Sequence, residues 1–166
     1  MTHSVVVRPA TPNDTETVFA LIQALAEYEK LSHEVTGSVE ALTDHLFGDR
    51  PVVEALLADI AEQSVGFALF FTNYSTFLTK PGLYLEDLFV LPEYRGRGIG
   101  KALIQQLAQL AVERDCGRLE WSVLDWNAPA IGFYERMGAA VLSDWRTCRV
   151  TGEHLLHLAS LPMQTL

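Results

Sequence analysis

Three glycines alternate with basic and apolar residues in mid-chain, in the segment Arg95-Gly-Arg-Gly-Ile-Gly-Lys101. Glycine tolerates positive φ angles and lets the backbone approach a ligand closely. A helix that begins in such a turn directs its first N–H groups and the positive end of its dipole towards an anion. The spacing is typical of a turn that binds phosphate groups, and a strand-to-helix loop without a ligand is the alternative.

Two common phosphate-binding motifs are excluded for this turn. The sequence contains no GxxxxGK[ST] pattern, which excludes a P-loop. A dinucleotide-binding fingerprint needs GxGxxG after the first strand, whereas this turn lies in mid-chain. The chain has 12 Lys and Arg residues against 21 Asp and Glu residues, so the basic side chains gathered in this turn favour an anionic ligand.

Hydrophobic periodicity predicts the elements around the turn. Helical spacing indicates a helix capped at Asn13-Asp14, one capped by Ser38, one that follows the glycine turn and ends before Gly117, and a short one over residues 128–137. Apolar runs of strand length lie at residues 5–8, 52–58, 64–72, 83–90, 119–123, 139–145 and 146–150. This order predicts an α/β fold, with a mixed central sheet and helices on both faces.

Composition limits the class of protein. A chain of 166 residues, 49% hydrophobic, is expected to form a single domain over residues 1–166, with its core at about 5–159. The formal net charge of −9 argues against nucleic acid as a partner. No apolar run approaches the roughly 20 residues of a membrane helix, so we expect a cytoplasmic protein. The histidines and the cysteines Cys116 and Cys148 lack metal-ligand spacing, so no metal is expected.

A second motif makes a resemblance specific. The segment Asn127-Ala-Pro-Ala-Ile-Gly-Phe-Tyr-Glu-Arg-Met-Gly138 matches N-x-x-A-x-x-F-Y-x-x-x-G, and the glycine turn matches R/Q-x-x-G-x-G/A. Both patterns, in this order, are similar to signatures of the GNAT acetyltransferase superfamily. Four further segments resemble its diamine (spermidine/spermine) subfamily and the thialysine-acetylating branch: Arg8-Pro-Ala-Thr, Ala26-Glu-Tyr-Glu29, Leu83-Tyr-Leu-Glu-Asp87 and Val123-Leu-Asp-Trp-Asn127.

The resemblance implies a GNAT fold, a homodimer, acetyl-CoA as cosubstrate and transfer of its acetyl group to a primary amine of a small cationic substrate. It implies that backbone groups of Leu88, Phe89 and Val90 hold the acetyl and pantetheine arm. The pyrophosphate would lie against Arg95, Gly96, Arg97, Gly98, Ile99, Gly100 and Lys101, and other CoA contacts would come from Asn127, Pro129, Ala130, Tyr134 and Arg136. The amine would lie among Tyr28, Glu29, Glu86, Asp87, Glu120, Trp121 and Ser122.

Glu86 and Asp87 are neighbours in the strand predicted over residues 83–90, so one of the two faces the cleft. A primary amine has a pKa of about 10, so the site must remove a proton before the nitrogen attacks the thioester. An ordinary carboxylate, with a pKa of about 4, is a weak base. Glu86 therefore acts through water, acts with a raised pKa, or only anchors the ammonium group.

Tyr134 is the candidate proton donor. The attack creates an oxyanion, which backbone N–H groups at an interrupted strand stabilise, and expels a thiolate. A phenol with a pKa of about 10 can protonate that thiolate. Core packing is the alternative for Tyr134, a solvated helix end is the alternative for Tyr28 and Glu29, and Trp121 either packs in the core or lines the amine channel.

One segment departs from the polyamine-specific pattern. Those members carry an acidic residue and a Trp before Leu-Tyr-Leu-Glu-Asp, whereas this chain has Asn73-Tyr-Ser-Thr-Phe77. A short amine such as thialysine, lysine, ornithine or a small diamine is therefore as good a candidate as a polyamine. The rival functions are a protein acetyltransferase acting on lysine or an N-terminus, and a catalytically silent CoA-binding module. The intact Glu86, Asn127 and Tyr134 argue against the silent module.

Overall fold

The structure is a computed structural model that describes residues 4–162. The chain divides between Ser122 and Val123 into two compact units. No helix in the described part of the chain is long and apolar enough to cross a membrane.

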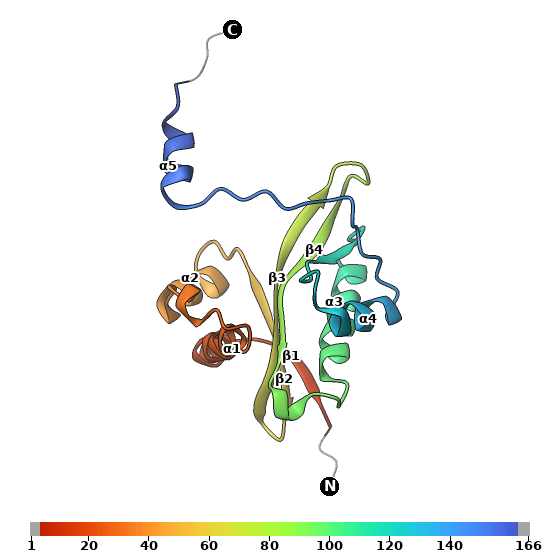
Figure 1. Ribbon diagram of the computed structural model, residues 1–166. Helices are drawn as coiled ribbons and strands as arrows, with labels where there is room; N and C mark the ends of the chain where they lie inside the picture. Colours follow the sequence, from red (N-terminus) through yellow and green to blue (C-terminus); the bar gives the residue numbers. More distant parts are fainter. Residues whose placement is uncertain (1–3, 163–166) are drawn as a thin grey trace. The chain divides into compact units, whose positions relative to one another are not determined.

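The first unit contains a five-stranded sheet in the order β1-β2-β3-β4-β5 (Figure 1). The first four strands pair antiparallel with their neighbours, and β5 pairs parallel to β4. The strands are β1 (Val6–Pro9), β2 (Glu54–Ile60), β3 (Gln63–Ser75), β4 (Lys80–Val90) and β5 (Leu119–Trp121). The sheet is therefore mixed, as the sequence predicts.

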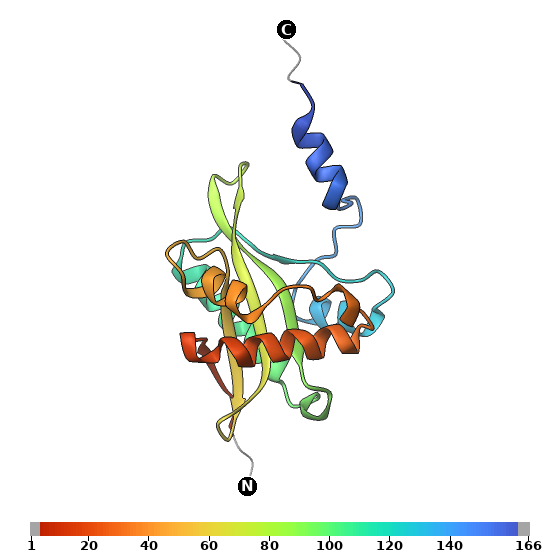
Figure 2. The same cartoon turned by 90° about the vertical axis from the view of Figure 1, so that its left-hand side faces the viewer.

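Helices cover both faces of this sheet. α1 (Thr15–Tyr28) and α2 (Val39–Phe47) lie on one face, and α3 (Ile99–Glu113) lies on the other (Figure 1). α1 runs across the strands (Figure 2), and α3 is the crossover that the parallel pairing of β4 and β5 requires. Single-turn 3-10 helices lie at Pro12–Asp14, Ser32–Glu34 and Pro92–Tyr94. The predicted fold class, an α/β sheet with helices on both faces, is confirmed.

The apolar stripes found in the sequence form the two core layers. Between the sheet and α1 and α2, the buried cluster comprises Val18, Leu21, Leu46, Ala55, Leu57, Phe67, Leu69 and Phe89. On the other face, α3 buries residues at helical spacing, namely Ile99, Leu103, Ile104, Leu107 and Ala111. Ser38 caps α2 as predicted, because its hydroxyl accepts a hydrogen bond from the Ala41 N–H (3.2 Å).

The hairpin between β2 and β3 is tighter than predicted. The sequence suggests a polar loop over residues 59–63, but only Ala61 and Glu62 lie between the strands. Both have positive φ angles, 48° and 65°, as a two-residue turn that matches the twist of the strands requires. Neither residue is the Gly or Asn that signals such a turn.

The second unit contains two helices within its described residues, α4 (Ala128–Arg136) and α5 (Gly152–Ser160). α4 follows the prediction, and Gly138 after it has a φ of +93°. The strand pair predicted over 139–145 and 146–150 is wrong, because no strand forms there. The run is broken by Ser143-Asp144 and carries Arg146 and Arg149, and a lone two-stranded hairpin is at best marginally stable in water.

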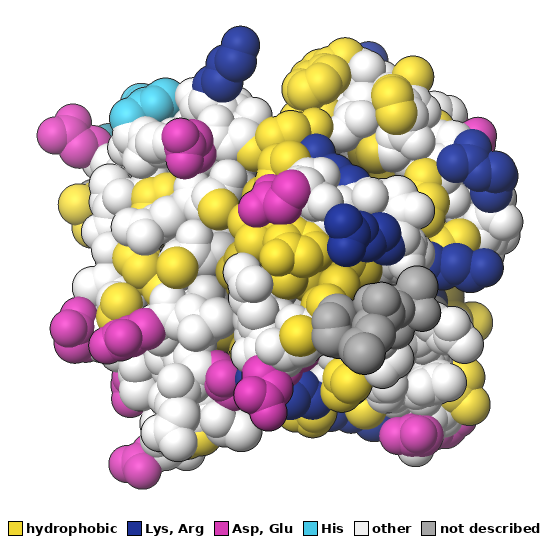
Figure 3. Space-filling view, turned by 90° about the horizontal axis from the view of Figure 1, so that it is seen from below, with side chains coloured by type: hydrophobic (Ala, Val, Ile, Leu, Met, Phe, Trp, Pro, Cys, Tyr) yellow, Lys and Arg dark blue, Asp and Glu magenta, His cyan; other side chains and the backbone are white. Residues whose placement is uncertain are grey.

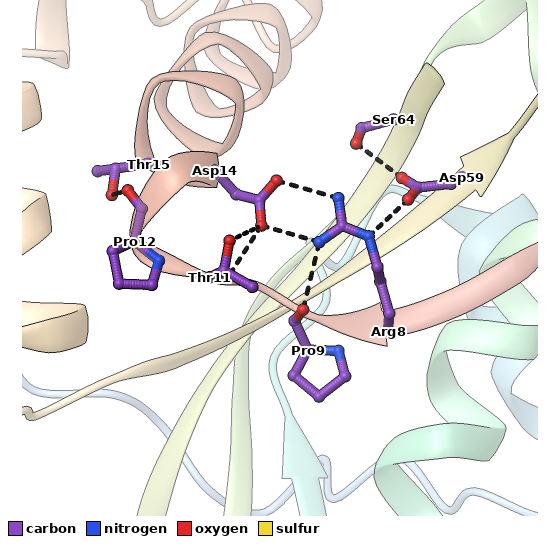
Figure 4. A network of polar contacts seen from close by, with 8 residues as sticks. All are labelled: Arg8, Pro9, Thr11, Pro12, Asp14, Thr15, Asp59 and Ser64. Atoms are coloured by element: carbon purple, nitrogen blue, oxygen red, sulfur yellow. Dashed lines mark hydrogen bonds and ion pairs between the residues drawn. The ribbon is translucent and has the colours of Figure 1, made fainter. Parts of the chain in front are cut away.

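Arg8 joins three elements of the first unit (Figure 4). Its guanidinium donates two hydrogen bonds to Asp14, at 2.8 and 3.0 Å, and a third to Asp59 at 2.6 Å. Asp14 also accepts from the N–H and the hydroxyl of Thr11, both at 2.7 Å, and Ser64 donates to Asp59 at 2.7 Å. These contacts fix β1 to the start of α1 and to β2, and they hold the pKa of Asp14 well below its usual range.

We expect Asp14→Asn to lower the free energy of unfolding by about 1.5–3 kcal/mol at pH 7, the size of a hydrogen bond to a charged group. Because the folded-state pKa of Asp14 lies below the unfolded value of about 3.9, its contribution is present above about pH 4 and is lost as the pH falls. The variant should therefore lose less stability than the wild type between pH 5 and pH 2. Urea unfolding across this range measures both effects, with the exposed Asp49→Asn as control. An unchanged pH dependence in Asp14→Asn would contradict this role.

Candidate active site

A β-bulge in β4 decides which way the acidic pair points. Leu85 lies opposite Phe70 and Asp87 lies opposite Leu69, so Glu86 is an extra residue without a partner on β3. Residues opposite one another share a face of a sheet, and Leu69 belongs to the core cluster under α1 and α2. The bulge therefore places Asp87 on the face that α1 covers, while Glu86 is exposed.

Two glutamate charges act on the Asp87 carboxyl group at this place. Burial, together with the negative charges of Glu86 and Glu29, raises the pKa of Asp87 to about 6. Glu29 follows the last residue of α1, so the end of this helix contributes to an acidic cluster beside the bulge. Acidic side chains are also prominent from below on the side of α1 and α2 (Figure 3). Such a cluster favours a cationic ligand.

Tyr28 and Arg95 connect the end of α1 to the end of β4. The guanidinium carbon of Arg95 lies 4.1 Å from the centroid of the Tyr28 ring and 5.5 Å from that of Phe89. Arg95 Nε donates a hydrogen bond to the Val90 carbonyl at 2.9 Å. These contacts bring together Tyr28, predicted to contact the amine, and Arg95, predicted to contact the pyrophosphate.

The glycine turn has the conformation that its sequence predicts. Gly96 and Gly98 have φ angles of +76° and +80°, and a Cβ added at either would meet no other part of the chain within 4 Å. Glycine is therefore needed for the backbone conformation and not for internal packing, and the space beside the turn stays open. α3 begins at Ile99 without a side-chain cap, so its first N–H groups suit an anion. The residues present fit a pyrophosphate group.

The last part of β4 has an open edge. Among the described residues, β5 pairs with β4 only from Leu83 to Leu85. Leu88, Phe89 and Val90 consequently have no strand partner on that side. The Val90 carbonyl accepts the hydrogen bond from Arg95 Nε, and the other backbone groups on that side are available to an extended ligand. Ile99, in contrast, buries its side chain in the core at 2% exposure, so only its backbone can serve a ligand.

Glu120 and Ser122 already have partners in the protein. Tyr84 and Ser122 share a hydrogen bond of 2.7 Å between their hydroxyl groups. Glu120 Oε1 lies 2.7 Å from Arg118 Nε and accepts a hydrogen bond from Asn73 Nδ2 at 3.1 Å. Trp121 lies opposite Leu85, on the face of the sheet that α3 covers, which favours packing over a place in an amine channel.

In the second unit, Asn127 caps α4, because its side chain accepts a hydrogen bond from the Ala130 N–H at 3.3 Å. Pro129 lies in the first turn of the helix, where its missing N–H has no cost. Burial raises the pKa of Tyr134, so its phenol keeps its proton at neutral pH. Arg136 ends α4 and is exposed. Asn127 thus has a structural role that the sequence interpretation did not include.

Sequence reasoning did not identify Asn73, Tyr84 and Arg118 as site residues. The alternation of polar residues at 118, 120 and 122 places them on one face of a strand, and this pattern could have pointed to Arg118. Within residues 4–162, no three His, Cys, Asp or Glu side chains are grouped in a way that could hold a metal ion.

Comparisons with known proteins define the class. Residues 20–139 match the Acetyltransferase (GNAT) family. Thialysine N-epsilon-acetyltransferase of Sus scrofa is 39% identical, over 94% of this chain and 98% of that protein. L-ornithine N5-acetyltransferase of Arabidopsis thaliana is 34% identical, over 90% of this chain and 85% of that protein. The structure of an integron cassette protein from V. cholerae is similar with a TM-score of 0.79 and 26% identity, over 96% of this chain and all of that one.

The chain therefore belongs to the GNAT acetyltransferase family and is an acetyltransferase. The resemblance drawn from the glycine turn and from the segment Asn127 to Gly138 is confirmed.

We expect the Asp87 carboxyl to titrate near pH 6 in a carbon-13 NMR pH titration. Glu86→Gln should move this midpoint to lower pH, because it removes a negative charge that disfavours ionisation of Asp87. Glu16→Gln, at the exposed far end of α1, is the control and should leave it in place. A wild-type midpoint near pH 4 would contradict both the burial of Asp87 and the effect of the two glutamate charges on it.

Proposed function

We propose that this protein transfers the acetyl group of acetyl-CoA to a primary amine of a small diamine, polyamine or basic amino acid, by direct attack of the amine on the thioester. One observation carries the proposal: the acidic cluster Glu29, Glu86 and Asp87 lies in β4 and at the end of α1, directly before an open, basic glycine turn. A cation site next to an anion site suits an ammonium substrate and a pyrophosphate-bearing cosubstrate.

The chain's own residues supply the binding groups for acetyl-CoA. We assign the pyrophosphate to the turn from Arg95 to Lys101, and the pantetheine arm to the open edge of β4 at Leu88, Phe89 and Val90. The family signature assigns further contacts to Asn127, Pro129, Ala130, Tyr134 and Arg136. The bound thioester supplies the acetyl group and a thiolate as leaving group.

Proton transfer from the ammonium group is assigned to the acidic pair. The pKa of Asp87, about 6, suits a group that accepts a proton near neutral pH. The exposed Glu86 contributes charge that holds the ammonium group and accepts its proton, directly or through water. Since Asp87 loses its own proton as the pH rises through 6, the proposal requires activity to increase over that range.

The two remaining steps, stabilisation of the oxyanion and protonation of the thiolate, need hydrogen-bond and proton donors. As the nitrogen attacks, negative charge grows on the thioester oxygen, and backbone N–H groups at the end of β4 stabilise it. Tyr134 gives its proton to the departing thiolate, and its raised pKa means that the proton is present at neutral pH.

Relatives of this chain support an amine substrate, because their names specify thialysine and ornithine. On the family resemblance we also propose a cytoplasmic homodimer that binds neither nucleic acid nor membrane. The net charge of −9 supports the first of these exclusions.

Acetyl-CoA turnover, followed by thiol release with a panel of amines and peptides, tests the proposal. We expect small amines to be acetylated and Gly98→Glu to abolish turnover, since it places a negative side chain beside the pyrophosphate and strains a left-handed residue. Gly37→Glu is the matched control, because a side chain there meets nothing within 4 Å and the backbone is not left-handed. Full acetyl-CoA binding by folded Gly98→Glu in calorimetry would refute the assignment of the turn, and acetylation of peptides alone would favour a protein acetyltransferase.

Tyr134→Phe should lower kcat by roughly 10²–10⁴, the range of general acid catalysis, with little change in affinity for acetyl-CoA. The hydroxyl is needed when the thiolate leaves and not when acetyl-CoA binds. Steady-state and single-turnover kinetics separate the two effects. Phe133→Leu, at the neighbouring ring 5.4 Å away, tests for a packing effect. An unchanged kcat with chemistry rate-limiting would assign Tyr134 to packing.

A further inference from the structure

β5 and the residues that flank it present three polar side chains on one face. Glu120 lies opposite Tyr84, and Leu119 lies opposite the buried Leu83. Side chains alternate along a strand, so Arg118, Glu120 and Ser122 share the face of Tyr84. This is also the face of Asp87, because Tyr84 pairs with Phe71 and Asp87 with Leu69, two residues apart on β3. A polar track therefore runs from Arg118 towards the acidic cluster.

Arg118 and Glu120 form a charge pair at the far end of this track. Arg118 Nε lies 2.7 Å from Glu120 Oε1, and the two side chains are 38% and 33% exposed. The Nε–H does not point at the carboxylate, since this buried atom has no hydrogen-bond partner among the described residues. The guanidinium donates from Nη2 to the Tyr74 carbonyl at 3.2 Å. With five N–H donors on a guanidinium, this leaves donors for a ligand.

A glycine in β4 and the side chain of Asn73 position this charge pair. Asn73 Nδ2 holds Glu120 Oε1 at 3.1 Å, and the buried Asn73 Oδ1 has no partner among the described residues. A Cβ at Gly82 would collide with Asn73 Oδ1 and would lie 3.1 Å from the Arg118 side chain. The absence of a side chain at Gly82 therefore leaves space over β4 in which Asn73 and Arg118 reach Glu120.

The two ends of the track differ in charge. The end at the bulge carries Glu29, Glu86 and Asp87, whereas the end at Arg118 carries one positive and one negative group. A second ammonium group of a polyamine would meet Arg118 there, at a cost in repulsion. A group with both charges matches instead, because a carboxylate accepts from the guanidinium fork and an ammonium donates to Glu120.

We propose that Arg118 and Glu120 bind the α-carboxylate and α-ammonium groups of a basic α-amino acid, whose side-chain amine reaches the acidic cluster and is acetylated. This inference rests on the proposed function and narrows its substrate class.

The spacing of the two ends suits such a molecule. Tyr84, which lies opposite Glu120, is three residue steps along β4 from Asp87, with the bulge between them. This gives roughly 7–10 Å at about 3.3 Å per residue. With bonds of about 1.5 Å, an extended ornithine or lysine side chain spans about 5–6 Å from its α-carbon to its terminal nitrogen. The α-groups and the side chains of the protein cover the remaining distance.

A matched pair of substrates tests the inference. L-ornithine and 1,4-diaminobutane differ only in the carboxylate, so the ratio of their kcat/KM values isolates its recognition. We expect the wild type to prefer ornithine and Arg118→Gln to lose this preference. Its kcat/KM for ornithine should fall roughly tenfold to a hundredfold, the range of a hydrogen bond to a charged group, through KM and not kcat. Its value for 1,4-diaminobutane should stay unchanged or rise.

Two further variants sharpen the result. Arg118→Lys keeps the charge without the planar fork and should be intermediate. Arg114→Gln is the control, because Arg114 pairs with Glu54 away from the track and should leave the ratio unchanged. Equal losses for both substrates in Arg118→Gln, or equal use of both by the wild type, would overturn the inference. Failure of the wild type to acetylate any amine would instead overturn the proposed function, and the inference with it.

Discussion

The single residue inserted in β4 at Glu86 is the constraint on which the candidate site depends. Before it, Leu83 and Leu85 are buried on the face that α3 covers; after it, Asp87 and Phe89 lie on the face of α1. In a regular strand Asp87 would follow the leucines into the apolar layer, where a carboxyl group without partners is strongly disfavoured. The bulge turns the same residue towards Glu29 and makes it part of the proposed cation site.

α1 keeps its position because both of its ends are tied to the sheet. At its start, Asp14 is bound by Arg8, which also reaches Asp59 on β2. At its end, Tyr28 lies under the guanidinium of Arg95, which is itself bonded to the Val90 carbonyl. Two arginines at opposite ends thus set where α1 crosses the strands. The same contacts fix the position of Glu29 relative to the glycine turn.

Short sequence patterns predicted those features of the structure that depend on backbone conformation and on the periodicity of nearby side chains. The glycine turn, the Ser38 cap and the buried stripe of α3 follow from backbone conformation and helical period, and the two signatures identified the family. An interrupted strand was expected, but the position of the bulge was not predictable, because Leu-Tyr-Leu-Glu-Asp has the pattern of a continuous strand and the insertion shows only in the pairing with β3. Ala61 and Glu62 carry no turn signal, and Val141 with Leu142 suggested a strand that has no partner to pair with. Such features depend on contacts between distant segments.

The two faces of β5 carry different kinds of side chain, which can change independently of one another. Leu119 and Trp121 lie on the side of α3, while Arg118, Glu120 and Ser122 lie on the opposite side. A substitution at one of the three polar positions alters what the face can recognise without disturbing the apolar packing or the glycine turn. If this face binds the amine as proposed, a lineage of such enzymes can drift from one amine to another through a few exchanges in one short segment, and a designer can follow the same route.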